Sequence, residues 1–330
     1  MTDINVPQPG EAIDELPPVG AADHGPAPFN PDDRIGVIAW VKQGMHEMFL
    51  VELDQTFDIR HSHLPGPLMD RIIPQCDSAI PKFGKTFYEP LTVLGYVAGF
   101  TSKVAIGTSA IILPYRNPVV IAKQLATLDV LSGGRLIFGA ASGWVEEEFD
   151  ALGVAFAARG PCSDEYLGTI KELWTRDRPG IPTLSNVHFQ PKPIQTPHPP
   201  IWIGGNSSRG IQRAAEFGDC WHPTRPSVQD VRVGKQRLAE AVERAGRRPE
   251  DVGIAAREPF LLDETMPADP RKPLLGPRGH ILDSLGGFDE LDVSHFVVDL
   301  FYSISALNDT TVDSVLRAME TLANDIRPNI

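Results

Sequence analysis

The fold is decided by the stretch GTSAIILPYRNPVVIAKQLATLDVLSGGRLIFGAASGW, which runs from Gly107 to Trp144. Both of its ends combine apolar, β-branched and small residues, a pattern typical of buried strands. Between them, Asn117 and Pro118 signal a helix start, because Asn can cap a helix and Pro is tolerated at the first helical position. Apolar residues then recur at helical spacing until Gly133, which is typical of a helix end. The stretch therefore predicts a strand–helix–strand unit.

The same alternation continues on both sides of this unit, from Arg34 onward. Short apolar runs alternate with longer segments of helical period, which favours an α/β fold with a parallel sheet. The candidate strands are Arg34–Val41, Phe57–Ser62, Lys103–Ile112, Arg135–Gly139, Pro200–Gly204, Gly218–Trp221, Val252–Arg257 and Ser294–Leu300. There are eight of these candidates, which is the number of strands in a closed (β/α)8 TIM barrel.

Three segments do not fit a minimal barrel. Residues 1–32 are rich in Pro, Gly, Ala and acidic residues, and such a segment buries too little apolar surface to offset its ordering entropy. We interpret it as a flexible arm that precedes a barrel domain over residues 33–330. Asp177–Pro199 and Glu264–Pro277 are Pro-rich excursions. Because active sites of such barrels lie where strands end, we expect long loop insertions there to act as lids.

The composition narrows the function classes. The 330 residues carry 43 acidic and 30 basic side chains, a net charge of −13, which argues against binding nucleic acid or an anionic membrane. No apolar run is long enough to span a membrane. The three cysteines form no CxxC pair, so we expect no disulfide framework and no thiolate zinc site, and we expect a cytoplasmic protein.

The strongest local motif is IWIGGNSSR, which begins at Ile201. An apolar strand runs into two glycines, which allow a ligand to approach the backbone, and then into a helix start, which attracts anions. As a phosphate site it would use Gly204, Gly205, Asn206, Ser207 and Arg209, with Arg213 one turn further on. A plain strand-to-helix turn with a capping Ser is the alternative.

Two other strand ends carry small residues. Ser142 and Gly143 follow one apolar strand and could seat a flat ring or a phosphate, or simply form a tight turn. Ser109 and Ala110 lie in the second half of another strand. They could leave room for a planar cofactor in the barrel mouth, or belong to a filled layer of the barrel.

His61 and His63 lie two residues apart, so on a strand they face the same side. This is the spacing of paired imidazole metal ligands, although one could pack at the strand end while the other is solvated. A metal would need a further ligand, for which Asp219, His222, His295 and Asp299 are eligible. Glu146–Glu148 instead indicates an acidic first helical turn rather than a catalytic carboxylate pair.

Taken together, three stretches resemble the luciferase-like class of flavin- or deazaflavin-dependent oxidoreductases. They are Gly107–Trp144, EEEFDALGVAFAARG from Glu146 to Gly160, and PKPIQTPHPPIWIGGNSSRGIQRAAEFGDCW from Pro191 to Trp221. The subgroup that they resemble most is that of probable coenzyme F420-dependent oxidoreductases. The sequence departs from the family pattern at Cys220, where Gly is customary, and at Trp144, where some F420 enzymes carry Glu.

The resemblance implies a (β/α)8 barrel of the bacterial-luciferase-like type that binds F420 or FMN at its C-terminal mouth. It implies a non-prolyl cis peptide at Ser109–Ala110, with the cofactor ring stacked near it. It places Gly204, Gly205, Asn206 and Ser207 on the phosphate side, and Ser142 and Gly143 in the loop after the fourth strand. A homodimer is expected by the same analogy.

The resulting hypothesis is an oxidoreductase that transfers a hydride between F420 and a small organic substrate, with His61 or His63 handling the proton. An FMN-dependent luciferase-like monooxygenase is the first alternative. A metal-dependent barrel hydrolase that uses His61 and His63, and a cofactor-binding module without catalysis, are the others.

Overall fold

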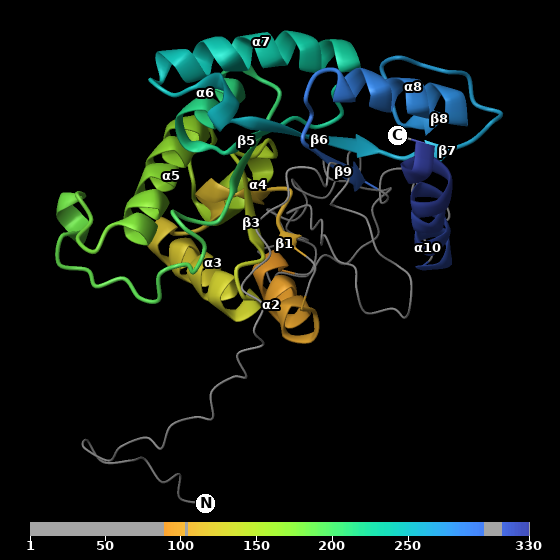
Figure 1. Cartoon of the computed structure of the whole chain (residues 1–330). Helices are drawn as coiled ribbons and strands as arrows, with labels where there is room; N and C mark the ends of the chain where they lie inside the picture. Colours follow the sequence, from red (N-terminus) through yellow and green to blue (C-terminus); the bar gives the residue numbers. More distant parts are fainter. Residues whose placement is uncertain (1–88, 103–104, 300–311, 330) are drawn as a thin grey trace, which may run out of the picture. The chain divides into compact units, whose positions relative to one another are not determined.

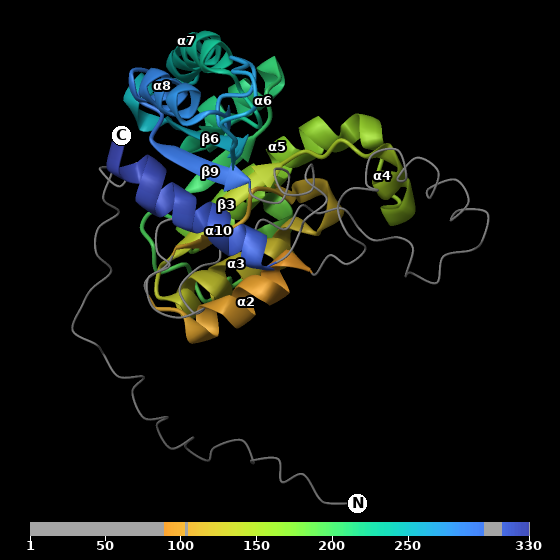
Figure 2. The same cartoon turned by 90° about the vertical axis from the view of Figure 1, so that its right-hand side faces the viewer.

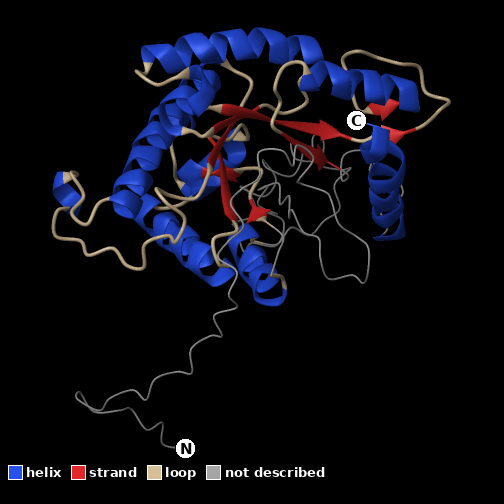
Figure 3. Ribbon diagram, viewed as in Figure 1, coloured by secondary structure: helices blue, strands red, loops and turns tan. Residues whose placement is uncertain are grey.

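The computed structural model describes residues 89–102, 105–299 and 312–329. In these residues a curved sheet of parallel strands has the order β1-β3-β4-β5-β6-β9, and β2 pairs with β3 (Figures 1 and 3). The strands are β1 (Ile106–Gly107), β2 (Ile111–Ile112), β3 (Leu136–Ala141), β4 (Ile201–Gly204), β5 (Cys220–His222), β6 (Gly253–Pro259) and β9 (His295–Asp299). Sequential parallel strands that curl in this way form an α/β sheet of the TIM-barrel type.

Helices connect successive strands and lie on the outer side of the curved sheet, as Figures 2 and 3 show. They are α2 (Pro90–Phe100), α3 (Pro118–Ser132), α4 (Glu146–Leu152), α5 (Arg159–Thr175), α6 (Ser208–Phe217), α7 (Val228–Arg244), α8 (Arg278–Asp289) and α10 (Val312–Thr321). Among the helices described, none has the length and apolarity that crossing a membrane would require.

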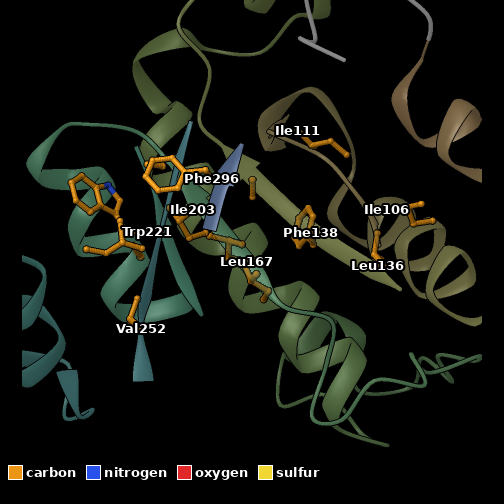
Figure 4. Packing of buried hydrophobic residues seen from close by; sticks show 14 of the residues in the cluster. Ile106, Ile111, Leu136, Phe138, Leu167, Ile203, Trp221, Val252 and Phe296 are labelled. Carbon is orange, nitrogen blue, oxygen red and sulfur yellow. The ribbon is translucent and has the colours of Figure 1, made fainter. Parts of the chain in front are cut away.

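Alternate residues of each strand pack into two different layers, because successive side chains of a strand point to opposite faces. On β3, Phe138 faces the helices and packs edge-on against Trp174 of α5, with ring centroids 5.8 Å apart (Figure 4). The opposite, inner face carries a separate buried cluster, which consists of Ile137, Trp202, Cys220, Ala255 and Val297. Side chains of β5, β6 and β9 that continue this inner face toward the strand ends are therefore the ones that can form a site.

Six of the candidate strands lie where the sequence predicts them. The candidates Arg34–Val41 and Phe57–Ser62 fall outside the described residues, as does the arm over residues 1–32. The candidate Lys103–Ile112 is a pair of short strands, β1 and β2, rather than one continuous strand.

The helix predicted after Asn117 is confirmed as α3. The Asn117 side chain accepts hydrogen bonds from the N–H groups of Val119 and Val120, at 2.9 and 3.3 Å. The helix ends at Gly133, whose φ of 70° is left-handed and favours glycine.

The two Pro-rich excursions differ from each other. Asp177–Pro199 contains one short 3-10 turn, Pro182–Leu184, and is otherwise irregular, as expected. Glu264–Pro277 instead ends in a short strand that the sequence did not indicate: β8 (Leu275–Gly276) pairs in parallel with β7 (Leu261–Leu262) in a separate two-stranded sheet. The run of prolines concealed this pairing because the strands are only two residues long.

A buried carboxylate fixes the first excursion to the barrel. Asp129 of α3 has no exposed surface, and its oxygens accept hydrogen bonds from the backbone N–H groups of Ile194 and Gln195 and from the Gln195 side chain, at 2.6–3.1 Å. The excursion therefore leaves α5 and returns to β4 along a defined path.

We expect Asp129→Ala to lower the free energy of unfolding by about 2–4 kcal/mol, because it removes the buried acceptor of three hydrogen bonds. We also expect protease cleavage within Asp177–Pro199 to become faster. Denaturant unfolding and limited proteolysis measure the two effects, and Asp283→Ala, on the exposed face of α8, is the matched control. Equal stability of the two variants would contradict the anchoring role.

Candidate functional site

Small residues from three segments meet where the strands end. A Cβ placed on Gly204, the last residue of β4, would lie 3.4 Å from the Ala141 Cβ of β3 and 3.6 Å from the Ala110 Cβ. Ala110, Ala141 and Gly204 thus form one patch with little side-chain volume, which we call the small-residue floor. The structure brings together two of the strand ends that the sequence singled out.

The peptide between Ser109 and Ala110 is cis, as the resemblance predicts. Ser109 itself is buried, and its Oγ lies 2.7 Å from the Nε2 atom of His222, the last residue of β5. The other ring nitrogen, Nδ1, lies 2.5 Å from the carbonyl oxygen of Ala255 on β6. Because a carbonyl can only accept, Nδ1 donates, Nε2 accepts, and the Ser109 hydroxyl donates to it.

Burial keeps the His222 ring neutral. Desolvation lowers the pKa of His222 to about 4, although the hydrogen bond to the Ala255 carbonyl acts in the opposite direction. At neutral pH the imidazole therefore carries one proton, on Nδ1, and serves Ser109 as an acceptor. His295 is also buried beside Trp202, with ring centroids 5.2 Å apart, and desolvation lowers its pKa to about 4 as well.

A buried ion pair holds the backbone of the same serine. Arg257 of β6 donates from Nη1 to the Ser109 carbonyl oxygen at 3.3 Å and from Nη2 to Asp299 Oδ2 at 3.1 Å. Arg257 is 8% exposed and Asp299 is 1% exposed, so the charges compensate each other out of contact with water.

The loop after β3 has the features of a cradle. Gly143 has a φ of 84°, and a Cβ there would lie 2.7 Å from Ile112 Cγ2, so only glycine fits. The neighbouring Ser142 Oγ is buried and has no hydrogen-bond partner among the described residues. A buried hydroxyl without a partner is costly unless a ligand satisfies it. Trp144 follows with 63% of its surface exposed.

The loop after β4 is tied down by its own polar groups. The Asn206 side-chain amide donates to the Thr224 carbonyl oxygen and accepts from the Thr224 N–H, at 2.8 and 2.9 Å. The Gly205 carbonyl oxygen accepts from the Trp221 indole N–H at 2.8 Å. Asn206 thus joins the loop after β4 to the loop after β5, as does the Gly205 N–H, which donates to the His222 carbonyl oxygen at 3.3 Å. Ser207 and Ser208 at the helix start are exposed.

The start of α6 carries the positive charge of the region. The Ser207 hydroxyl accepts from the Gly210 N–H at 3.1 Å and caps the helix. Arg209 is exposed and has no ion pair in the described part of the chain. Arg213, which the sequence suggested as a second cation here, instead binds Asp164 and the Gly160 carbonyl oxygen of α5. Of these two arginines, Arg209 is the one available to an anion.

Other candidates from the sequence lie elsewhere. His61 and His63 are outside the described residues. Among the residues that the structure describes, no three His, Cys, Asp or Glu side chains gather as a metal site requires. Asp219, an eligible ligand, accepts from the Ile201 N–H at 2.8 Å at the opposite end of the strand. Of the acidic helix turn, Glu148 is buried and accepts from the Tyr115 hydroxyl at 2.5 Å.

Sequence reasoning missed the joint role of His222, Arg257 and Asp299. In the sequence, His222 and Asp299 are only eligible as metal ligands, and no pattern points to a role for Arg257. The useful signal is register: Gly204 pairs with His222, so the inward position of β5 that faces the floor is a histidine.

The comparisons with known proteins fit this geometry. A sequence profile of the family described as luciferase-like monooxygenase matches residues 76–268, which is more than half of the chain. The chain belongs to this family. Members of the luciferase-like family are enzymes, and its relatives include both flavin- and F420-dependent proteins.

Two curated relatives are named for different reactions. The FMNH2-dependent dimethylsulfone monooxygenase of Pseudomonas putida is 30% identical over 153 residues, which are 44% of this chain and 42% of that protein. The phthiodiolone/phenolphthiodiolone dimycocerosates ketoreductase of Mycobacterium bovis is 32% identical over 188 residues, which are 54% of this chain and 48% of that protein. The chain thus spans about half the length of the curated relatives that it matches.

Solved structures establish the fold. A coenzyme F420-dependent tetrahydromethanopterin reductase of Methanopyrus kandleri superposes with a TM-score of 0.58 at 17% identity, covering 73% of this chain and 87% of that one. A monooxygenase of Streptomyces bottropensis gives the same TM-score at 19% identity, covering 73% and 82%. The fold is therefore α/β, of the luciferase-like TIM-barrel type.

Proposed function

We propose that this luciferase-like chain is an oxidoreductase that transfers a hydride between coenzyme F420 and a small organic substrate. The observation that carries the proposal is the small-residue floor, which adjoins the start of α6 through Gly204 and Gly205. A flat ring needs a surface without protruding side chains, and an anionic tail needs free N–H groups and a cation.

The described residues fit such a cofactor. Ser109, Ala110, Ser142 and Gly143 would lie on the ring side. The buried Ser142 hydroxyl has no hydrogen-bond partner in the part of the chain that the structure describes, and a ring heteroatom could serve as one. Gly204, Gly205, Ser207 and Arg209 would lie on the tail side, whereas Asn206 would shape the loop rather than touch the ligand. When bound, the cofactor supplies the redox chemistry, and the protein orients the reactants and excludes water.

The second candidate is an FMN-dependent monooxygenase, which the match to the FMNH2-dependent enzyme of Pseudomonas putida favours. In either case His61 or His63 would hold or move the proton at the reacting atom. We further propose a homodimer and a cytoplasmic location.

Fluorescence titration with F420 and with FMN, oxidised and reduced, tests the proposal. We expect F420 to bind with micromolar or tighter affinity and FMN to bind more weakly. Preferential binding of reduced FMN would favour the monooxygenase. A protein that binds neither would contradict both.

A second prediction concerns the anionic tail. We expect Arg209→Ala to weaken the binding of FMN about tenfold, since a charge-assisted hydrogen bond to phosphate contributes about 1.5–3 kcal/mol. The loss should shrink as salt screens the charge. Riboflavin, which lacks the phosphate, should bind the variant as it binds the wild type. Arg232→Ala, an exposed arginine of α7, is the control. Equal losses for FMN and riboflavin would exclude a role of Arg209 at the tail.

A further inference from the structure

We propose that His222 and Arg257 are positioning residues: together they hold the hydroxyl and the carbonyl oxygen of Ser109, and so fix the small-residue floor against which the ring binds. The inference rests on the proposed function, because the floor matters only if a planar cofactor lies on it. It assigns a role to residues that the resemblance does not single out.

The first interaction fixes the side chain of Ser109. His222 comes from β5, 113 positions beyond Ser109, and its Nε2 accepts the Ser109 hydroxyl proton at 2.7 Å. The imidazole cannot turn away without breaking its second bond, from Nδ1 to the Ala255 carbonyl oxygen. The chain Ser109–His222–Ala255 therefore links the loop between β1 and β2 to two strands across the sheet.

The second interaction fixes the backbone of Ser109. The Ser109 carbonyl oxygen belongs to the peptide that joins Ser109 to Ala110, and Arg257 donates to that oxygen. Asp299 in turn fixes the guanidinium, which is buried beside it. Any shift of the Ala110 methyl toward or away from Gly204 must therefore break a bond to His222, a bond to Arg257, or both.

The hydrogen bonds to Ser109 come in addition to those that already attach the loop between β1 and β2 to the sheet. Thr108, the preceding residue, already ties the loop to β3 through two hydrogen bonds with the Gly139 backbone, at 2.8 and 3.1 Å. The additional bonds converge on the one residue whose neighbour, Ala110, forms the floor. Because a misplacement of about 1 Å in a site is enough to cost large factors in rate or binding, a floor held from several strands makes physical sense.

The direction of the Ser109–His222 hydrogen bond determines which side chains can replace His222. With Nδ1 donating to Ala255, the Ser109 hydroxyl must donate to Nε2, so its oxygen remains an acceptor only. A glutamine at position 222 can still accept from Ser109 through its Oε1, whereas a phenylalanine of similar volume cannot.

The experiment compares His222→Phe, His222→Gln, Ser109→Ala and the double variant Ser109→Ala/His222→Phe. FMN and riboflavin serve as ring probes with and without the phosphate, and F420 as the third probe. For each variant three quantities are measured: the dissociation constant, the position of the visible absorption band of the bound ring, and the midpoint of denaturant unfolding. His295→Phe is the matched control, since His295 lies in the same buried layer beside Trp202.

We expect His222→Phe and Ser109→Ala each to weaken binding about tenfold, equally for FMN and riboflavin, and to shift the absorption band. The double variant should lose no more than either single one, and His222→Gln should restore most of the affinity. His295→Phe should lower the unfolding midpoint without moving the band or the affinity.

Unchanged affinity and band in a folded Ser109→Ala or His222→Phe protein would overturn the inference and leave the proposed function intact. Additive losses in the double variant would overturn it too, because they would show that the two residues act separately. If the wild type binds none of the three probes, the proposed function fails, and this inference fails with it.

Discussion

Replacing Gly139 with alanine is expected to destabilise the barrel more than a glycine-to-alanine substitution at any other described glycine. A Cβ at this position of β3 would lie 1.8 Å from the backbone oxygen of Thr108, and 3.5 Å from the Ser109 Cα. Backbone cannot give way as a flexible side chain can, so β3 and the loop before β2 must separate. We expect the free energy of unfolding to fall by at least about 4 kcal/mol, as measured by denaturant unfolding.

The matched control is Gly286→Ala in α8. Gly286 is exposed, and a Cβ there would meet nothing within 4 Å, so alanine should stabilise the helix by about 0.5–1 kcal/mol. If Gly139→Ala were as stable as the wild type, β3 and the Thr108 carbonyl could not be as close as the structure has them. Because the substitution displaces the segment that carries Ser109, a folded Gly139→Ala protein should also bind the ring probes poorly.

The closeness at Gly139 also shows what the sequence could and could not predict. The pattern of apolar runs identified the positions of β3, β4 and β6, because burial on both faces demands such runs. It did not predict that the strand around Gly107–Ile112 is interrupted. At the interruption the Thr108 side chain binds the Gly139 backbone from 31 positions away, and such a contact leaves no mark in local periodicity.

The candidate site was predictable by residue type but not by what each residue binds. Gly204, Ala110 and Gly143 were recognisable as small residues at or near predicted strand ends, although a tight turn or a filled barrel layer explained them equally well in the sequence. Asn206 and Arg213 looked equally suitable for a phosphate, yet the structure shows Asn206 bound to Thr224 and Arg213 bound to Asp164. Whether a polar side chain is available to a ligand depends on its partners, which the chain brings from distant positions.

The second large effect concerns Glu258 of β6 and the dependence of stability on pH. Glu258 is 1% exposed, and its Oε1 has no hydrogen-bond partner in the part of the chain that the structure describes. Desolvation raises the pKa of this carboxyl to about 9, with Asp230 and Asp299 acting in the same direction and Arg225 opposing them. The folded protein therefore keeps a proton on Glu258 at neutral pH.

Proton linkage determines whether the stability of the folded state rises or falls with pH. Between pH 4.5, the ordinary pKa of the group, and about 9, the folded state holds a proton that the unfolded state has released. Stability from this group is fully present below pH 4.5 and is lost as the pH rises, at up to about 1.4 kcal/mol per pH unit. His222 and His295 act in the opposite sense, since their pKa values of about 4 make the protein lose stability as the pH falls below 6.5. Stability should therefore be greatest near pH 6.5.

Glu258→Gln removes the alkaline part of this profile. The amide keeps the shape of the protonated acid and releases no proton, so its free energy of unfolding should stay nearly constant from pH 7 to 9, where that of the wild type falls by about 2 kcal/mol. The variant should thus equal the wild type near pH 5 and exceed it at pH 9. Denaturant unfolding at each pH measures the difference, and Glu243→Gln, on the exposed side of α7, should leave the wild-type profile unchanged. Parallel profiles for wild type and Glu258→Gln would mean that Glu258 is ionised in the folded protein, and a carboxylate so deeply buried would then need a cation to pair with it.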